Sequence, residues 1–125
     1  MRFEDLQLWK RSIHLSTNIY DELRDTNNYI LNDQITRSGL SLPGNIAESF
    51  ERESPNECIE FLSHAKGSCS KLRTQIYIGM HTGHIKRNVG TEWIRETNEI
   101  SSMLNRLIKS RLSSDIFNHE LRDTI

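Results

Sequence analysis

The sequence predicts an all-α protein that folds as an antiparallel up-down-up-down four-helix bundle. Its 125 residues include only two prolines and six glycines, and runs of β-branched residues are absent. Apolar residues recur at spacings of three and four over most of the chain, which is the period of an amphipathic helix. Short connections between such segments favour antiparallel neighbours. We expect the bundle to occupy residues 1–112 and residues 113–125 to form a weakly ordered C-terminal tail.

The first helix is expected over about residues 4–25, where apolar spacing is helical. It carries two adjacent apolar stripes, so we expect it to touch neighbours on two sides. One stripe comprises Leu6, Trp9, Ile13, Ser16, Tyr20 and Leu23, and the other comprises Leu8, Leu15 and Ile19.

The second helix, expected over about residues 30–52, contains a Pro-Gly pair. In a helix interior, proline costs about 3 kcal/mol and glycine about 1 kcal/mol relative to alanine. The apolar positions nevertheless keep helical phase across Pro43, from Ile35 to Phe50. That continuity predicts a helix bent at Pro43 rather than a loop.

The third helix has the clearest start in the chain. Ser54 suits the N-cap, Pro55 suits the first helical position, and Glu57 completes a capping box. A seam of small and apolar residues then runs from Cys58 to Gly83, and the helix should end near there. After a connection at residues 87–90, a fourth helix is expected over about residues 91–111.

Composition limits the class of protein. Charged residues make up 26% and hydrophobic residues 35% of the chain. The first residues lack the apolar segment of a signal peptide, and no run approaches the roughly 18 apolar residues that a membrane span requires. We therefore expect a cytoplasmic protein without a membrane partner.

The net charge of −1 hides an asymmetry. Residues 1–65 hold 6 basic and 11 acidic side chains, residues 66–111 hold 9 and 3, and residues 112–125 hold 1 and 3. Clustered cations are what binding to a phosphate backbone needs, although a solvated basic face is the alternative. The candidate nucleic-acid-binding residues are Lys66, Lys71, Arg73, Lys86, Arg87, Arg95, Arg106 and Lys109.

Metal and catalytic sites find little support. A di-iron bundle needs paired Glu-x-x-His motifs, whereas Glu60 and His64 are four apart and no second histidine accompanies them. His81 and His84 are three apart, but no cysteine or carboxylate lies beside them. No phosphate loop or nucleophile elbow is present. The sequence predicts no enzyme, no metal, no cofactor and no catalytic residue.

A polar stripe follows the second helix at spacings of three and four. It is either a solvent-exposed face or a subunit contact in which amide and charged groups pair across an interface. The candidate subunit-interface residues are Gln34, Arg37, Asn45, Glu48 and Arg52.

Three stretches together resemble a known family. FEDLQLW at residues 3–9, LNDQITRSGLSLPGNIAES at 31–49 and FLSHAKGSCSKL at 61–72 are similar to the bacterial four-helix-bundle proteins encoded within intervening sequences of 23S ribosomal RNA genes. The accessory protein of diversity-generating retroelements belongs to the same structural group. The resemblance covers about residues 3–110. It implies a homopentamer around a central channel, an RNA- or retroelement-associated setting and no established enzymatic activity.

The matching positions include the stripe on the second helix, with Asn-Ile-Ala-Glu at residues 45–48 as the hallmark. The chain departs from the family pattern at Ser38-Gly39, at Ser49 and at Lys71. The last change either alters a subunit contact or adds to a basic surface.

The sequence therefore predicts a non-enzymatic homo-oligomer, with the pentamer as the expected state, that contacts RNA or another nucleic acid through a basic surface. The alternative is a protein-interaction scaffold that serves a reverse transcriptase or another protein partner and binds no nucleic acid.

Overall fold

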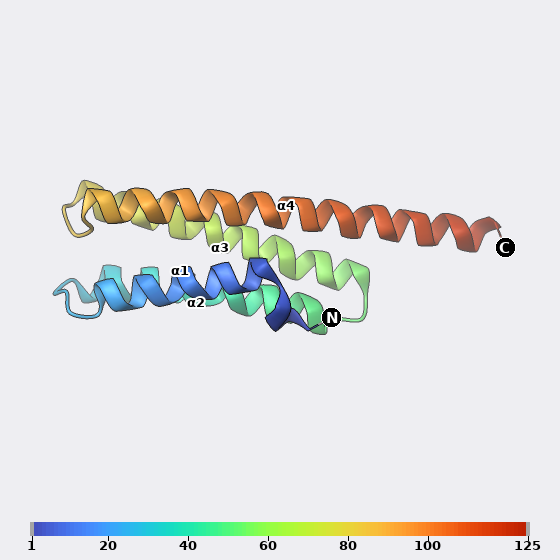
Figure 1. Cartoon of the computed structure of the whole chain (residues 1–125), viewed down its shortest axis with the longest axis horizontal. Coiled ribbons are helices and arrows are strands. Elements are labelled where there is room, and N and C mark those ends of the chain that lie inside the picture. Colours follow the sequence, from blue (N-terminus) through green and yellow to red (C-terminus); the bar gives the residue numbers. More distant parts are fainter. Residues whose placement is uncertain (1, 125) are drawn as a thin grey trace.

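The computed structural model describes the backbone of residues 2–124 and the side chains of residues 2–113. A short 3-10 helix, η1 (Phe3–Asp5), precedes four α-helices (Figure 1). These are α1 (Gln7–Leu23), α2 (Tyr29–Glu51), α3 (Pro55–His81) and α4 (Arg87–Thr124). The described part of the chain contains no strand. The predicted all-α four-helix fold is confirmed.

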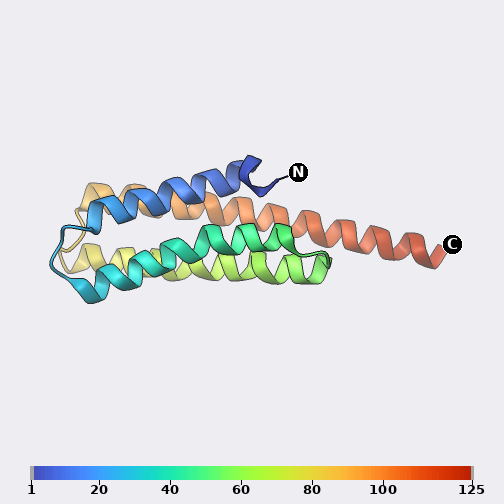
Figure 2. The same cartoon turned by 90° about the horizontal axis from the view of Figure 1, so that it is seen from below.

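The helices pack in the cyclic order α1, α2, α3, α4, and the contact between α1 and α4 is the least extensive of the four. The α1–α2 loop (residues 24–28) and the α3–α4 loop (residues 82–86) lie at one end of the bundle, hereafter the loop end (Figures 1 and 2). The α2–α3 connection lies at the other end. There α4 runs on past the other three helices (Figure 1).

One apolar core joins all four helices. Its fully buried aliphatic side chains alternate along α2, α3 and α4 at spacings of three and four, as the sequence predicts. The largest of them are Leu15, Ile19, Ile35, Leu42, Ile46, Leu62, Leu72, Ile76, Ile100 and Leu104.

In α1 the core takes one apolar stripe whole and only the two ends of the other, where Trp9 packs against it and Leu23 is buried. Leu8, Leu15 and Ile19 are buried, whereas Ile13 and Tyr20 of the other stripe are exposed. A helix at the corner of a bundle presents roughly one 100°-wide stripe to the core, so a second stripe beside it faces outward. The outward stripe of α1 is free to meet something other than this core.

The helix α2 is continuous through Pro43, which is buried, and this confirms a helix rather than a loop at the Pro-Gly pair. Its axis changes direction near its middle in Figure 2. The side chain of Asn28 caps its first turn by accepting a hydrogen bond from the backbone N–H of Leu31, at 3.1 Å.

The predicted start of α3 is confirmed. Ser54 is the N-cap, its Oγ accepts from the Glu57 backbone N–H at 3.4 Å, and Pro55 is the first helical residue. A serine hydroxyl at the N-cap accepts from a free backbone N–H of the first turn, and a proline at the first helical position has no N–H that needs a partner.

The prediction for the last connection is wrong by about one turn. Residues 87–90, expected as a connection, already belong to α4, and the chain reverses at residues 82–86 instead. Gly83 has a positive φ of 75°, and the N–H groups of His84 and Ile85 donate to the Gly79 carbonyl oxygen at 2.8 and 2.9 Å. This Schellman-type ending closes α3 within a few residues.

Beyond the predicted bundle boundary at residue 112, the backbone of α4 is helical as far as Thr124. The side chains from residue 114 onward lie outside the described residues. The division at residue 112 and the weak order of residues 113–125 stay predictions.

Candidate nucleic-acid and subunit-contact surfaces

Two sets of contacts fix how α4 faces its neighbours. On one side Glu96 accepts from Arg11 of α1, at 2.7 Å to Nε and 2.9 Å to Nη2. On the other side Thr97 and Ser101 accept from Arg73 of α3, both at 3.1 Å. The remaining arc of α4, opposite its core residues, is exposed to solvent.

Basic and acidic residues both occupy this exposed arc. Helical geometry, at 3.6 residues per turn, places Glu92 and Glu99 on the part of the arc toward α1. The same geometry places Arg95 and Arg106 on the outermost part and Lys109 on the part toward α3. All five side chains are exposed, and Arg95 pairs with Glu92 at 2.7 Å. Of the basic residues of α4, Lys109 therefore lies nearest α3, and Glu99 lies between Arg95 and Arg106 along the outer part of the arc.

The flank of α3 that faces α4 adds two more cations. Lys66 lies one heptad before Arg73 on that flank. Arg73 contacts Thr97 and Ser101, and α3 and α4 are antiparallel, so Lys66 lies about level with Arg106. Lys66 is partly exposed. We call this surface the α3–α4 basic face, and it comprises Lys66, Arg73, Arg95, Arg106 and Lys109.

Arg73 joins α3 to α4 on this face. It is half-buried, and its Nε and Nη2 donate to the hydroxyl oxygens of Thr97 and Ser101. Two of its five N–H donors thus hold α3 against α4, which leaves Lys66, Arg106 and Lys109 as the more available cations.

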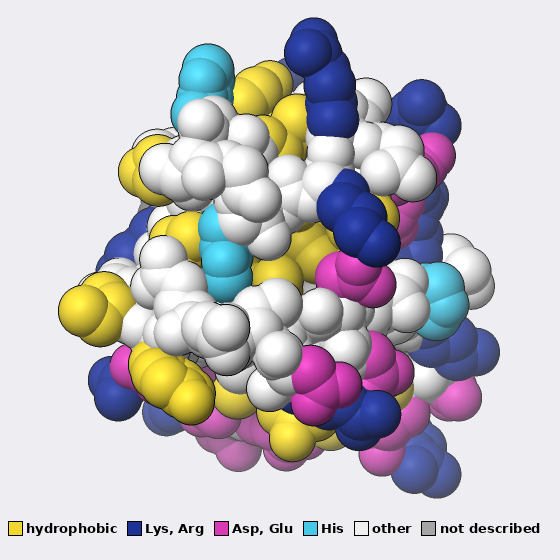
Figure 3. Space-filling view, turned by 90° about the vertical axis from the view of Figure 1, so that its left-hand side faces the viewer, with side chains coloured by type: hydrophobic (Ala, Val, Ile, Leu, Met, Phe, Trp, Pro, Cys, Tyr) yellow, Lys and Arg dark blue, Asp and Glu magenta, His cyan; other side chains and the backbone are white. Residues whose placement is uncertain are grey.

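The other three predicted nucleic-acid residues lie elsewhere. Lys71 is on the flank of α3 toward α2, where it lines a groove with Arg37. Lys86 and Arg87 are exposed at the loop end. Figure 3, which looks onto that end, shows Lys and Arg side chains projecting from the side on which α4 lies, and hydrophobic side chains standing out at the lower edge. The structure brings five of the eight predicted residues onto one face.

The predicted polar stripe of α2 runs along the flank that faces α3. Asn45 donates to the Ser41 carbonyl oxygen at 2.9 Å, and Arg37 pairs with Asp33 at 3.1 Å. Arg52 forms an ion pair with Glu48, and its guanidinium stacks on Phe61 of α3, 4.7 Å from the ring centroid. Gln34 is exposed. Internal pairing thus occupies most of the stripe's charges.

A groove of about 530 Å³ lies between α2 and α3 on this side. Ser41 Oγ donates to Ser68 Oγ across it at 2.8 Å, which fixes the register of the two antiparallel helices. We call it the α2–α3 groove. It is lined by Asp33, Gln34, Arg37, Ser38, Ser41, Gly67, Ser68 and Lys71.

The carboxylates and histidines considered as metal ligands are dispersed. Glu60 and His64 are exposed on α3, and His64 packs edge-on against Phe61. Among the described residues, no three side chains of His, Cys, Asp or Glu come together in a cluster that suits a metal ion. The expected absence of a metal or cofactor stays a prediction.

His84 has a different role, which the sequence did not indicate. Its Nε2 lies 2.7 Å from Asn32 Oδ1 and 3.4 Å from Thr26 Oγ1, while Asn32 Nδ2 donates to the Leu23 carbonyl oxygen at 2.9 Å. These bonds connect the two loops at the loop end. A histidine and an asparagine 52 residues apart give no local signal, so sequence patterns alone miss the link.

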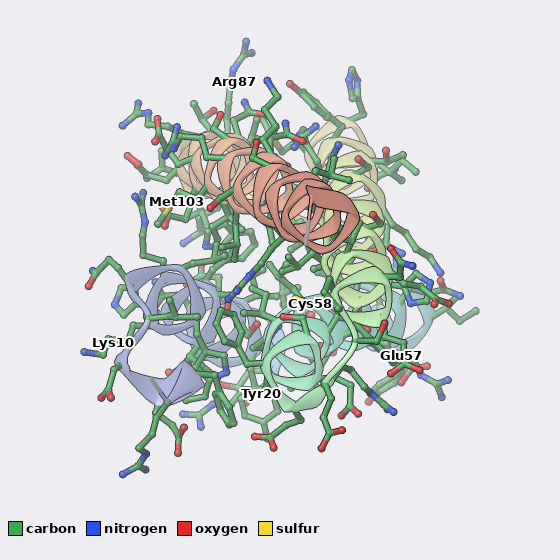
Figure 4. The ribbon with its side chains drawn as sticks, turned by 90° about the vertical axis from the view of Figure 1, so that its right-hand side faces the viewer. Lys10, Tyr20, Glu57, Cys58, Arg87 and Met103 are labelled. Carbon is green, nitrogen blue, oxygen red and sulfur yellow. The ribbon has the colours of Figure 1, made fainter. Side chains whose placement is uncertain are left out.

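Both cysteines, Cys58 and Cys69, are free and buried. Burial raises the pKa of the Cys69 thiol, which keeps it protonated and unreactive. In Figure 4, Cys58 points into the middle of the bundle, whereas Lys10 and Arg87 project from different sides.

No helix among the described residues combines the length and the hydropathy that crossing a bilayer demands.

Comparisons with known proteins agree with this architecture. No curated protein matches the chain. A crystal structure at 1.70 Å of a protein of unknown function from the S23 ribosomal protein family of Bacteroides thetaiotaomicron VPI-5482 superposes with a TM-score of 0.78. The two sequences are 22% identical, and the match covers 82% of this chain and 98% of the other, so it supports the fold. The model of the 23S rRNA-intervening sequence protein family matches residues 4–106. With the bundle, the continuous proline-containing helix and this match in hand, the chain belongs to the 23S rRNA-intervening sequence protein family.

Proposed function

We propose that this protein is a non-enzymatic homo-oligomer, with five copies as the expected state, that contacts RNA or another nucleic acid through phosphate groups. The contact surface is the α3–α4 basic face. The family description refers to intervening sequences of 23S rRNA, which supports an RNA-associated setting.

The observation that carries the proposal is the gathering of exposed cations on the outer part of α4 and on the adjoining flank of α3. The exposed cations of α4 lie on its outermost part and toward α3, where Lys66 joins them, and the exposed carboxylates Glu92 and Glu99 border them toward α1. Because the Debye length at physiological salt is about 8 Å, neighbouring cations on this face act together on a phosphate that lies against them, although Glu92 and Glu99 reduce the local charge. The whole-chain charge of −1 therefore does not prevent local binding of phosphates.

Fluorescence anisotropy tests the proposal. Labelled structured RNA, single-stranded RNA and duplex DNA are each titrated with the protein at several salt concentrations. We expect dissociation constants of about 1 μM or below at low salt, rising steeply with salt, because displaced counterions drive phosphate binding. No binding to any of the three ligands at low salt would overturn the nucleic-acid role.

Charge-matched variants then locate the surface. The triple variant K66Q/R106Q/K109Q removes three cations from the basic face, while the control R2Q/K10Q/R24Q removes three exposed cations from the α1 side. We expect weaker binding and a salt dependence with about three fewer released ions for the first variant only. An equal effect of both variants would show that net charge, rather than this face, governs binding.

The scaffold alternative is favoured by a different observation. Several large hydrophobic side chains outside the basic face are exposed, among them Tyr20, Tyr29 and Leu40. Exposed apolar patches mark contacts with other proteins. If nucleic acid does not bind, the search moves to a protein partner such as a reverse transcriptase, with pull-down from an extract of the native host as the assay.

A further inference from the structure

The outward apolar stripe of α1 continues onto α2. Ile13, Tyr20, Leu40 and Tyr29 are 37%, 55%, 62% and 80% exposed. The Ser16–Gly39 hydrogen bond fixes the pairing of the two helices, and Ile13 and Tyr20 lie three before and four after Ser16 on the same flank of α1. Leu40 follows Gly39 on the facing flank of α2. We call these four residues the α1–α2 ridge.

The ridge is one surface rather than scattered side chains. Tyr20 and Tyr29 line a common hollow with Thr36 between α1 and α2. Figure 4 places Tyr20 at the outer edge between these two helices, pointing away from the core. Tyrosine and bulky aliphatic residues at such positions are typical of the buried centre of protein interfaces.

The α2–α3 groove has the opposite shape. Its floor is made of small residues, and a Cβ built on Gly67 would meet no atom within 4 Å. Gln75, one turn beyond Lys71 on the same flank of α3, is only 8% exposed, and its Oε1 accepts no hydrogen bond from the described residues. Gln75 thus lies beneath the surface beside the groove and does not line it.

The two surfaces lie at the same height along the bundle. Along α2, the groove extends from Asp33 to Ser41. The ridge extends from Tyr29 to about residue 42, because Ser16 pairs with Gly39 and Ile13 lies three residues before Ser16. Copies related by a rotation axis parallel to the bundle all sit at the same height. The ridge of one copy and the groove of the next would then face each other directly.

We propose that the α1–α2 ridge of one copy docks in the α2–α3 groove of a second copy, head to tail. The proposal rests on the homo-oligomer proposed above and names its interface. The two surfaces differ, as a heterologous contact requires, and only heterologous contacts close rings with an odd number of copies. Both surfaces flank α2, and adjacent faces of an idealised four-helix bundle stand at roughly a right angle, so repetition of the contact closes a small ring of about four copies or slightly more.

Chemistry supports the pairing as well as shape. Arg37 and Lys71 stand at the groove, where they can lie over the tyrosine rings of the ridge, and such cation–π contacts contribute about 0.5–2 kcal/mol each. The serine hydroxyls can pair with the tyrosine hydroxyls. The α3–α4 basic face does not take part, so it stays on the outside of the ring.

Two variants test the two halves of the contact. Y20Q/L40Q removes the ridge, and G67Q fills the groove with a residue that also favours the helix more than glycine does. The matched control is Y77Q/L112Q, which replaces one tyrosine and one leucine that are 46% and 45% exposed elsewhere. By native mass spectrometry and light scattering, we expect each test variant to be monomeric and the control to assemble like the wild type. Circular dichroism checks that all variants stay folded.

Mixing gives the sharper result. Y20Q/L40Q keeps its groove and G67Q keeps its ridge, so an equimolar mixture should form a heterodimer with one intact interface and grow no further. Absence of the heterodimer would contradict a head-to-tail contact.

The outcomes separate this inference from the proposed function. A monomeric wild-type protein would overturn the homo-oligomer and the interface together. A wild-type oligomer whose test variants assemble as well as the control would overturn the interface alone.

Discussion

The hydroxyl of Ser16 in α1 donates a hydrogen bond to the carbonyl oxygen of Gly39 in α2, at 2.5 Å. In an uninterrupted helix that carbonyl would accept from the backbone N–H four residues later, but residue 43 is proline and has none. Ser16 therefore replaces the donor that Pro43 lacks. A Cβ on Gly39 would lie 3.7 Å from Ser16 Oγ, an ordinary van der Waals contact, so the hydrogen bond does not depend on glycine at this position.

Replacing Ser16 by alanine should remove the donor that takes the place of the missing N–H of Pro43. The Gly39 carbonyl, buried between the helices, would lose its donor, and we expect the free energy of unfolding to fall by about 1–3 kcal/mol. In a Pro43→Ala background the alanine N–H takes over, and the same replacement should cost less than about 1 kcal/mol. Urea denaturation of the four proteins forms a double-mutant cycle. Additive costs would mean that Ser16 does not compensate for the proline.

The bidentate pair between Arg11 and Glu96 predicts a pH dependence of stability. The hydrogen bonds from Arg11 lower the pKa of Glu96 below its ordinary value of 4.5 in the folded state. A carboxyl group with a lowered folded pKa stabilises the fold above its unfolded pKa and loses that contribution as the pH falls through the folded value. We expect about 1 kcal/mol or less, since both side chains are about a third exposed.

The measurement is the free energy of unfolding of the wild type and Glu96→Gln between about pH 7 and pH 3. The difference between the two should be largest near neutrality and shrink below about pH 4.5. The control is Glu60→Gln on the exposed side of α3, which removes a carboxyl group outside this pair. A constant difference for Glu96→Gln would show that the pair does not couple protonation to folding.

The hydrogen bonds of Asn32 at the loop end should contribute to the stability of the fold. Asparagine at this position donates to the Leu23 carbonyl oxygen and accepts from His84. We expect Asn32→Ala to lower the free energy of unfolding by about 1–3 kcal/mol, because both partners are partly buried. The exposed Asn98→Ala serves as the control, and thermal unfolding is the readout. Equal melting temperatures for the two variants would contradict the link.

Two glycines should respond to alanine in opposite directions. At Gly79 a Cβ would overlap the Ile85 side chain, so Gly79→Ala should destabilise by about 1–3 kcal/mol. At Gly44 no atom lies within 4 Å of the Cβ position, and Gly44→Ala should stabilise by up to about 1 kcal/mol. Chemical denaturation of both variants checks the signs. A neutral Gly79→Ala would mean that the α3–α4 turn rearranges at little cost.

Local patterns predicted much of the fold. The Ser54 cap, the helical phase across Pro43 and the apolar seam from Cys58 each depend on residues within a few turns of one another, and the structure contains all three features. The start of α4 escaped prediction because residues 87–90 look like a turn when they are read alone. Only the packing of Gly90 against Met80 explains why a glycine suits the first turn of that helix.

The candidate surfaces depended far more on tertiary structure. The sequence identified the basic residues. The rotation of α3 about its axis decides that Lys66 lies beside Arg106 and that Lys71 lies on the other flank. Two apolar stripes on α1 were visible in the sequence, yet nothing local says which of their residues the core takes. The sequence by itself determined which helices form, because helix formation follows spacing and capping. The tertiary structure alone decided which faces remain outside, because that depends on how four helices rotate to bury one common core.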